Sequence, residues 1–545
     1  MMGAMAGRTG KRLERAMVVA VLSCAITACS DSRAGGDAAG GSTLSGGSST
    51  DGAPPNGAAR GSASEALSDD GARLGGLGDL PRPAAAAPRI LEGTDRDDHL
   101  GHALSAPGRI APGGATILAV GGGTKWEESR AERNLKRDCL ALFALGSGAP
   151  DLPLLTIEGV RGGDRFAFDL CLAPGLLGDP GLTDLVAGAP RGPVVKLGDE
   201  QRPAERGALY IFAAQTLVAG RGGELTSAEA DLVLVGPSDG GRLGYSVAAA
   251  GDLDGDGIGD LVAGAPGGPL AAADGGRVLL ISGARLRALR ESGRRRVAVD
   301  DAELAARTLC VGAPGDLLGS DVAVVAAGSG HGLIAAGAPQ CAWDAEADTF
   351  LATGGEGRGY VVVADGSAEG AGAPRRIGGG DPLASFGKAV AWLAPPGRSP
   401  LLAVGSPLAA AEAGADSGRV AIHDLDRAEA LAVLTGERAE GRFGWSLAAS
   451  SDGAWLAVGA PNDSIARTGE EAAIGYRRGT VSLVPVPASG VVGERTAFHG
   501  QDARDHFGYA VSPQEAPGSF WGGALAWPGE GGTEVGRVYA LTADG

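Results

Sequence analysis

The sequence has no excess of positive charge and few aromatic side chains. Its 545 residues include 65 acidic and 47 basic residues, a net charge of −18, and only 4% are aromatic. A protein that binds nucleic acid needs a basic face, because contacts to the phosphate backbone supply much of the affinity. The acidic balance therefore argues against a nucleic-acid partner and against attraction to an anionic lipid surface.

Signatures of catalysis are also scarce. No zinc-type His-x-x-x-His pair occurs among the six histidines, which are His99, His102, His331, His423, His499 and His506. The stretch Gly328-Ser329-Gly330 falls in an apparent loop, whereas a serine nucleophile elbow needs a strand-to-helix turn. We therefore expect no enzymatic activity, and catalysis by residues from distant loops stays as an alternative.

A short apolar run near the N-terminus indicates export. It extends from Ala16 to Ala28 and follows four basic residues, Arg8, Lys11, Arg12 and Arg15. Such a run is too short to span a bilayer and is typical of a secretory signal. It ends Ile26-Thr27-Ala28-Cys29, which resembles a bacterial lipobox. This resemblance implies that Cys29 is acylated and becomes the mature N-terminus; the alternative is an ordinary signal with an incidental cysteine.

The composition divides the chain into three parts. Residues 1–28 are the predicted lipoprotein signal peptide. Residues 29–88 are rich in Gly, Ser, Ala and Pro and have few large apolar side chains, so they cannot bury enough surface to fold. We expect them to be a disordered tether. Residues 89–545 are the predicted folded part.

Glycine is abundant, with 96 residues, and many of them belong to a repeat. Seven times a large apolar residue is followed by a small one, and a short apolar run that usually ends near Gly-Ala-Pro comes next. The seven pairs are Leu100-Gly101, Phe166-Ala167, Leu243-Gly244, Leu318-Gly319, Phe386-Gly387, Phe443-Gly444 and Phe507-Gly508. A repeat with a period of tens of residues indicates a solenoid, a propeller or an array.

Each repeat contains four short apolar runs bounded by Gly, Pro and Asp, which predict four antiparallel strands. Seven such units predict an all-β fold, a seven-bladed β-propeller. The run at residues 89–93 matches the fourth run of the other repeats, and the last repeat has no fourth run. We expect this N-terminal strand to complete the last blade, which leaves no open sheet edge. The alternative is a frayed N-terminal extension.

The repeat resembles the FG-GAP repeat of the integrin α-subunit head over about residues 89–545. Two copies depart from the pattern: Ala167 replaces the glycine of the second pair, and the seventh copy lacks Gly-Ala-Pro. The resemblance implies that one face of the propeller meets a partner. On that face we expect enlarged loops at residues 122–138, 340–358 and 462–478. Trp126 and Trp343 lie in two of them and are candidate binding anchors, or they only cover their loops.

One loop has the residues of a calcium site. Asp252, Asp254, Asp256 and Asp260 stand at positions 1, 3, 5 and 9, and the carbonyl of Ile258 stands at position 7. Calcium takes six to eight oxygen ligands in flexible geometry. The resemblance implies that these five residues bind Ca²⁺ between two strands of a blade, and the alternative is a solvated acidic turn. The other copies do not keep the set, so we expect a structural role in one blade.

Four cysteines lie in the predicted folded part: Cys139, Cys171, Cys310 and Cys341. An exported protein can form disulfides, and four cysteines allow three pairings. The short separations favour Cys139–Cys171 and Cys310–Cys341, and unpaired buried thiols are the alternative.

The sequence thus predicts a lipid-anchored protein of the bacterial cell envelope, most readily at the outer membrane or the cell surface. Its propeller would bind a protein or a glycan, as in adhesion, and would hold one structural calcium ion. A non-adhesive scaffold subunit of an envelope complex is the second hypothesis. A polysaccharide-active enzyme is the third.

Overall fold

The computed structural model describes residues 89–543 with several gaps. The residues outside the description are 1–88, 94–98, 124–137, 147, 161–162, 193, 198–199, 204, 268–274, 329–330, 345–348, 368–372, 464–476, 490, 502–503, 526–534 and 544–545. The predicted signal peptide, the tether, Cys29 and Trp126 therefore lie outside the described residues. So does the side chain of Trp343, although its backbone belongs to a strand.

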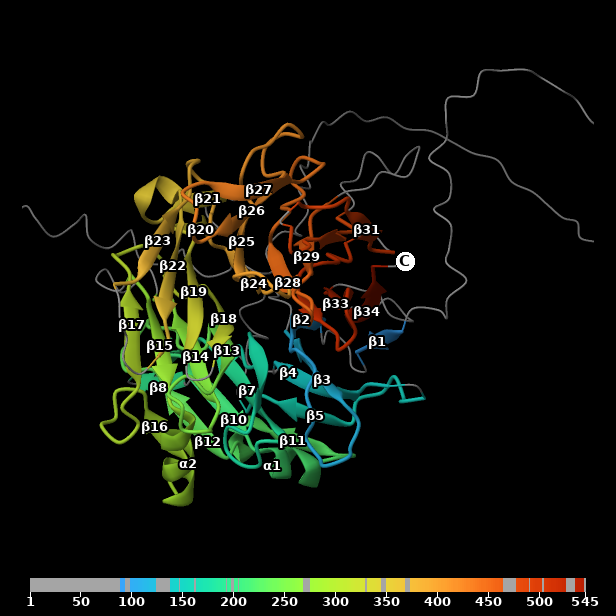
Figure 1. Ribbon diagram of the computed structural model, residues 1–545. Coiled ribbons are helices and arrows are strands. Elements are labelled where there is room, and N and C mark those ends of the chain that lie inside the picture. The colour runs from blue at the N-terminus through green and yellow to red at the C-terminus, as the bar shows by residue number, and fades with distance from the viewer. Residues whose placement is uncertain are drawn as a thin grey trace, which may run out of the picture. The chain divides into compact units, whose positions relative to one another are not determined.

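The described chain is an all-β, seven-bladed propeller, as the sequence predicts (Figure 1). The first blade contains β2 (Leu100–Leu104), β3 (Ile117–Gly122), β4 (Cys139–Ala144) and β5 (Leu155–Glu158). The second contains β6 (Leu170–Pro174), β7 (Thr183–Ala189), β10 (Ala208–Phe212) and β12 (Leu232–Val235). The third contains β13 (Ser246–Gly251), β14 (Asp260–Ala265), β15 (Arg277–Ile281) and β17 (Arg307–Val311).

Four further blades complete the ring. The fourth contains β18 (Asp321–Gly328), β19 (His331–Ala338), β22 (Tyr360–Asp365) and β23 (Arg375–Gly378), and the fifth contains β24 (Ala389–Leu393), β25 (Leu401–Ser406), β26 (Arg419–Asp424) and β27 (Ala430–Thr435). The sixth contains β28 (Ser446–Ala449), β29 (Trp455–Ala460), β30 (Thr480–Pro485) and β31 (Thr496–His499). The seventh contains β32 (Val511–Pro513), β33 (Ser519–Ala524), β34 (Arg537–Thr542) and β1 (Ile90–Glu92). Within every blade these four strands pair antiparallel.

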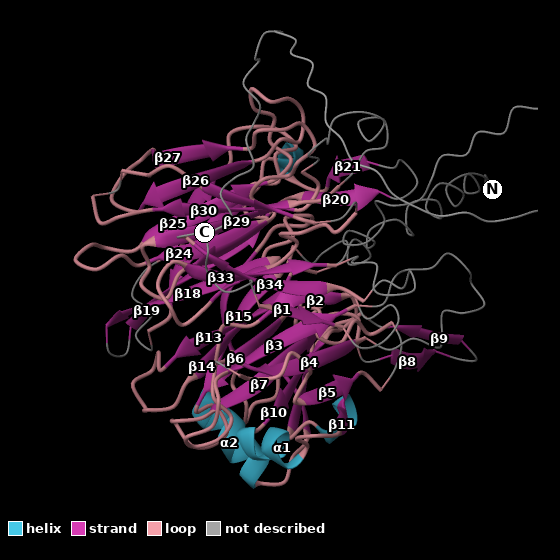
Figure 2. Cartoon of the chain, turned by 90° about the vertical axis from the view of Figure 1, so that its right-hand side faces the viewer, coloured by secondary structure: helices cyan, strands magenta, loops and turns pink. Residues whose placement is uncertain are grey.

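Short elements decorate the blades. The strands β11 (Glu224–Thr226) and β16 (Arg296–Ala298) pair parallel with β5 and β12. Two hairpins, β8 (Val194–Leu197) with β9 (Glu200–Pro203) and β20 (Cys341–Asp344) with β21 (Thr349–Ala352), project on the same side of the blades (Figure 2). The helices are α1 (Ala214–Ala219) and α2 (Gly283–Glu291), and two 3₁₀ turns are η1 (Ser227–Glu229) and η2 (Gly355–Gly357).

The first strands of the blades form a closed ring. Each contacts the first strand of the next blade, in the order β2, β6, β13, β18, β24, β28, β32 and back to β2. The last blade is completed by β1, which pairs antiparallel with β34 through Ile90–Tyr539, Leu91–Val538 and Glu92–Arg537. The predicted closure by the N-terminal strand is therefore confirmed, and the seventh sheet has no missing strand.

Glycine is required where neighbouring blades touch. A Cβ added to Gly264 would overlap the carbonyl oxygen of Gly319 in the next blade, and five other interfaces repeat this contact between two glycines. In the remaining interface, Gly121 lies against the carbonyl of Ala167. Ala167 keeps the positive φ of its glycine counterparts, at 59°, so the exceptional repeat preserves the backbone and not the residue type.

The hydrophobic core lies between the blades. Phe166, Phe386, Phe443 and Phe507 are all at most 7% exposed, so the first residue of the repeat pair is a core residue. Trp392 and Trp445 are buried as well, at 7% and 9% exposure. Among the described residues no helix is long and apolar enough to cross a membrane.

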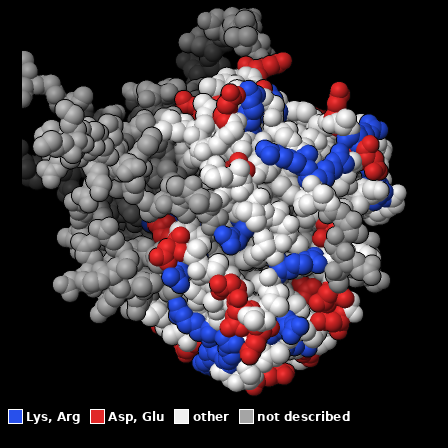
Figure 3. Space-filling view, turned by 90° about the vertical axis from the view of Figure 1, so that its left-hand side faces the viewer, with Lys and Arg blue, Asp and Glu red and all other residues white. Residues whose placement is uncertain are grey.

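Charges on the described surface are mixed. On the face drawn in Figure 3, basic and acidic side chains are interspersed and do not form one patch of a single sign. The arginines of α2 do not form a separate basic patch either, because two of them make ion pairs or hydrogen bonds with other parts of the protein. Arg290 pairs with Asp231 at 3.0 Å, and the Arg287 guanidinium donates to the Gly178 carbonyl at 2.7 Å.

Candidate functional site

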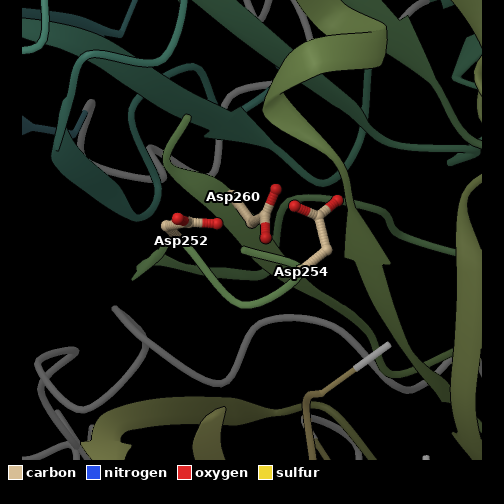
Figure 4. A group of neighbouring side chains, drawn as sticks. All are labelled: Asp252, Asp254 and Asp260. Carbon is tan, nitrogen blue, oxygen red and sulfur yellow. The ribbon is translucent and has the colours of Figure 1, made fainter. Parts of the chain in front are cut away.

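The aspartate hairpin, residues 252–260, joins β13 to β14. Carboxylate oxygens of Asp252, Asp254 and Asp260 all lie within 4.8 Å of one another. Figure 4 shows Asp260 between the other two side chains. Gly255 and Gly257 have φ of 81° and 83°, which lets the chain turn tightly enough to bring the three carboxylates together.

Backbone hydrogen bonds hold the carboxylates in place. Asp252 accepts from the N–H groups of Gly255 at 2.7 Å and Gly257 at 2.9 Å. Asp260 accepts from Leu253 N–H and from Gly283 N–H at the start of α2, both at 3.0 Å. Each oxygen of Asp260 therefore receives one backbone donor, and each has a second lone pair for another ligand.

Asp260 also has a structural role that does not depend on a metal. Its counterpart in the preceding blade is Asp184, which accepts from Leu177 N–H at 2.5 Å and from Ala214 N–H at the start of α1 at 2.7 Å. The same arrangement therefore joins hairpin, strand and helix in a blade without the other aspartates. Burial raises the pKa of Asp260 to about 6.

The hairpin fits a hard cation. Three carboxylates that converge on one point are the oxygen ligands that Ca²⁺ prefers. Within the described part of the chain, no other group of three His, Cys, Asp or Glu side chains has this geometry. Asp252, Asp254 and Asp260 would hold the ion, and the backbone carbonyl of Ile258 stays a predicted ligand.

Asp256 does not join the group that the sequence predicts for it. Its Oδ1 accepts from the Ile258 N–H at 2.8 Å, so the carboxylate stabilises its own turn. Burial and the neighbouring carboxylates of Asp254 and Asp252 raise the pKa of Asp256. The spacing of the aspartates predicts a four-carboxylate set, but the turn directs only three of them to the same point.

The predicted disulfides are wrong. Cys171 and Cys310 are free thiols, so neither the Cys139–Cys171 nor the Cys310–Cys341 bridge forms. Cys139 lies on β4 and Cys171 on β6, in sheets of different blades. Cys341 donates its thiol hydrogen to the Gly357 carbonyl at 3.3 Å. A short separation in sequence does not bring two Cβ atoms to the ~3.8 Å that a disulfide needs.

A second candidate site was missed by sequence reasoning. We call it the axial ring, the seven residues that directly follow the small residue of each repeat pair: His102, Phe168, Tyr245, Ser320, Lys388, Trp445 and Tyr509. Because the first strands form a closed ring, these positions meet around one centre. The aromatic side chains of the axial ring contact one another across blades, which no single repeat shows.

Five of the seven consecutive pairs in the axial ring are in contact, and the interruption lies at Ser320. The ring centroids of His102 lie 5.1 Å from Phe168 and 5.2 Å from Tyr509, and Phe168 lies 4.7 Å from Tyr245. Trp445 lies 5.8 Å from Tyr509, and the Lys388 ammonium lies 4.8 Å from the Trp445 centroid. Burial, aided by Arg165, lowers the pKa of His102 to about 3, so this imidazole is neutral at physiological pH.

A recess opens at the interruption, between Tyr245, Ser320 and Lys388. Its empty volume is about 640 Å³, part of it open to solvent. It is also lined by residues at the ends of second strands, including Pro266, Pro339 and Pro407, and by the β20–β21 hairpin. We call this side of the propeller the loop face. The aspartate hairpin joins a first to a second strand and therefore lies on the opposite face.

The blade with the aspartate hairpin matches a known repeat. Residues 243–281, which span the Leu-Gly pair, the hairpin and the strands β13 to β15, match the FG-GAP repeat. The chain carries an FG-GAP repeat. Together with the seven blades, this match agrees with the resemblance to the integrin α-subunit head. No curated protein matches the chain.

The FG-GAP repeat now has a physical explanation. Its first residue is core, its glycine contacts the preceding blade, and its Gly-Ala-Pro segment ends the second strand at the loop face. An FG-GAP propeller is in general a protein-interaction fold. The recess is therefore a candidate contact site, and the aspartate hairpin is a candidate metal site.

Proposed function

We propose that the protein is a lipid-anchored binding protein of the bacterial cell envelope whose loop face contacts a partner protein or glycan. The observation that supports this most directly is the recess at the axial ring, on the face where the enlarged loops start. It combines a mainly apolar lining, which includes the half-buried rings of Tyr245 and Phe350, with a cation, and this is typical of a binding site. We propose no catalytic role for it.

The anchor and the localisation are part of the proposal. Acylation of Cys29 would hold the chain at the membrane, and residues 29–88 would carry the propeller away from the surface. Such a chain reaches partners at the outer membrane or outside the cell.

Calcium has a structural role in this proposal. Three convergent carboxylates would hold one Ca²⁺, and the ion would stabilise the hairpin and its contact with α2. Because the hairpin and the recess lie on opposite faces, we expect calcium to affect stability and not the contact itself.

The test is a capture experiment with the purified protein on beads, exposed to cell-surface extract and to extracellular polymer. Retained material that disappears after protease treatment of the extract indicates a protein partner. Material that disappears only after polysaccharide digestion indicates a glycan. The amount of partner captured should be the same with Ca²⁺ and with chelator, at a temperature where the protein is folded with and without calcium.

Two outcomes would contradict the proposal. Stable co-purification with envelope proteins alone would favour the scaffold hypothesis. Turnover of a polysaccharide would favour an enzyme.

A further inference from the structure

The recess has an unusual charge for this protein. The chain carries a net charge of −18, yet the recess is lined by two cationic side chains, Arg242 and Lys388, and by no acidic side chain among the described residues. The other lining side chains are apolar or aromatic, or carry a hydroxyl or thiol group. An anionic group that enters this recess meets no opposing carboxylate there.

The two cations differ in what they already bind. Arg242 donates twice to the same oxygen of Glu205, at 2.9 and 2.6 Å, and also to the Gly267 carbonyl at 3.3 Å. Lys388 lies over the face of Trp445, and its ammonium makes no ion pair with any described residue. Lys388 is therefore the cation that has donors left for a ligand.

Two carboxylates of the ring interior also lie within electrostatic reach of Lys388. Asp169 accepts from Leu170 and Val247 N–H groups, and Asp321 accepts from Val322 and Val390 N–H groups, at 2.7 to 3.0 Å. Burial raises the pKa of both, and the charge of Lys388 opposes the rise. Each of the four oxygens accepts one backbone N–H, and the bonds from Val247 and Val390 join one blade to the next. Neither aspartate lines the recess.

Lysine is rare in this chain, so the position of Lys388 next to the recess is notable. The sequence has five lysines, Lys11, Lys125, Lys136, Lys196 and Lys388. Of these, only Lys388 has a described side chain, and it stands in the axial ring where the other members are aromatic, apart from Ser320. The small Ser320 leaves the space next to Lys388 open.

We propose that the recess binds an acidic side chain, Asp or Glu, within an apolar segment of a partner protein, with Lys388 as the specificity-determining residue. The carboxylate would accept from the Lys388 ammonium, and flanking apolar side chains would contact Tyr245, Phe350 and the Trp445 ring. A peptide with apolar neighbours around its acid fits better than a sugar, because most of the exposed lining surface is apolar. This inference rests on the proposed function and names its partner chemistry.

The test uses the full chain and a phage-displayed library of random peptides. Selected peptides should share an Asp or Glu with apolar neighbours. A synthetic copy of a selected peptide should lose about tenfold or more in affinity when its acid becomes the amide, since a charge-assisted hydrogen bond is lost. Bound peptide should also protect Lys388 from an amine-reactive reagent, as read by mass spectrometry.

Three variants locate the contact. Lys388→Gln should weaken peptide binding about tenfold or more, and Lys388→Arg should restore part of the loss. Ser320→Tyr should fill the recess and abolish binding with the charge intact; two counterparts, Tyr245 and Tyr509, are already tyrosines, so the backbone accepts this residue. The matched control is Arg285→Gln, an exposed cation on α2, which should change binding less than twofold.

The outcomes separate this inference from the proposed function. No enriched peptide, peptides without an acid, or binding that survives both Lys388→Gln and Ser320→Tyr would overturn it. If those variants still capture the surface partner, the propeller binds through another part of its surface, and the proposed function stands without this site. If wild type captures nothing, the proposed function fails.

Discussion

Single glycines decide how closely the blades approach. At six blade interfaces a glycine at the end of the second strand lies against the glycine that follows the large residue of the next repeat. Both partners at the contact are backbone atoms, which cannot move aside as a flexible side chain can. The residue pattern of the repeat is therefore a packing requirement as well as a turn requirement.

We expect Gly337→Ala to destabilise the propeller by about 1–3 kcal/mol, because a methyl group there would overlap the carbonyl of Gly387. Gly378→Ala is the control, since a methyl group at that position meets nothing within 4 Å. Chemical denaturation should place the control at or slightly above wild type. Equal stability of both variants would contradict the packing argument.

A buried carboxylate predicts a pH dependence. Burial raises the pKa of Asp169 to about 7, against an ordinary value of 3.8. Between these values the folded state holds a proton that the unfolded state releases, so the free energy of unfolding falls as pH rises. The slope is at most about −1.4 kcal/mol per pH unit for this group.

Comparing wild type with Asp169→Asn isolates the effect. The stability of wild type relative to the variant should be highest near pH 4 and should decline toward pH 7. Denaturation curves at several pH values give the two profiles, and parallel profiles would exclude a raised pKa for Asp169.

Among the elements, β1 is short but completes the ring of blades. It supplies three residues, yet it closes the seventh blade, and Leu91 is fully buried among residues of the first and seventh blades. We expect Leu91→Ala to cost about 2–5 kcal/mol of stability. The control is Glu92→Ala, which removes a half-exposed side chain paired with Arg537 and should cost at most about 1 kcal/mol.

Limited proteolysis adds a second measurement for β1. If β1 closes the ring, Leu91→Ala should speed cleavage in the first and last blades. Cleavage confined to residues before β1 would mean that the strand is not needed for closure.

The aspartate hairpin predicts one calcium ion per chain, measured by calorimetry. Asp252→Asn and Asp254→Asn should each weaken binding about tenfold or more and remove the rise in melting temperature that calcium causes. Asp256→Asn is the matched control, because its carboxylate lies outside the convergent group and should matter much less. Equal losses at all three positions would restore the four-carboxylate set.

For the whole molecule, the testable feature is attachment to the membrane. Cys29→Ser should move the protein from the membrane fraction to the soluble fraction and abolish labelling by a radioactive fatty acid. The substitution lies far in sequence from the blades, so peptide binding by the released protein should be unchanged. Retention of Cys29→Ser in the membrane fraction would contradict acylation as the anchor.

The sequence by itself determined the number of blades, the closure by β1 and the place of the acidic hairpin. Each of these is encoded locally, in the spacing of glycines, apolar runs and aspartates along a few tens of residues. The same local pattern could not tell which aspartates converge. That depends on positive φ at Gly255 and Gly257 and on the N–H groups that orient each carboxylate.

Only the tertiary structure decided the fate of the cysteines and the existence of the axial ring. Cys139 and Cys171 are near in sequence but belong to different sheets, so their short separation along the chain did not predict a disulfide correctly. Lys388 and Tyr245 are far apart in sequence and line one recess because seven first strands close into a ring. Contacts of this kind arise from ring closure, which no single repeat contains.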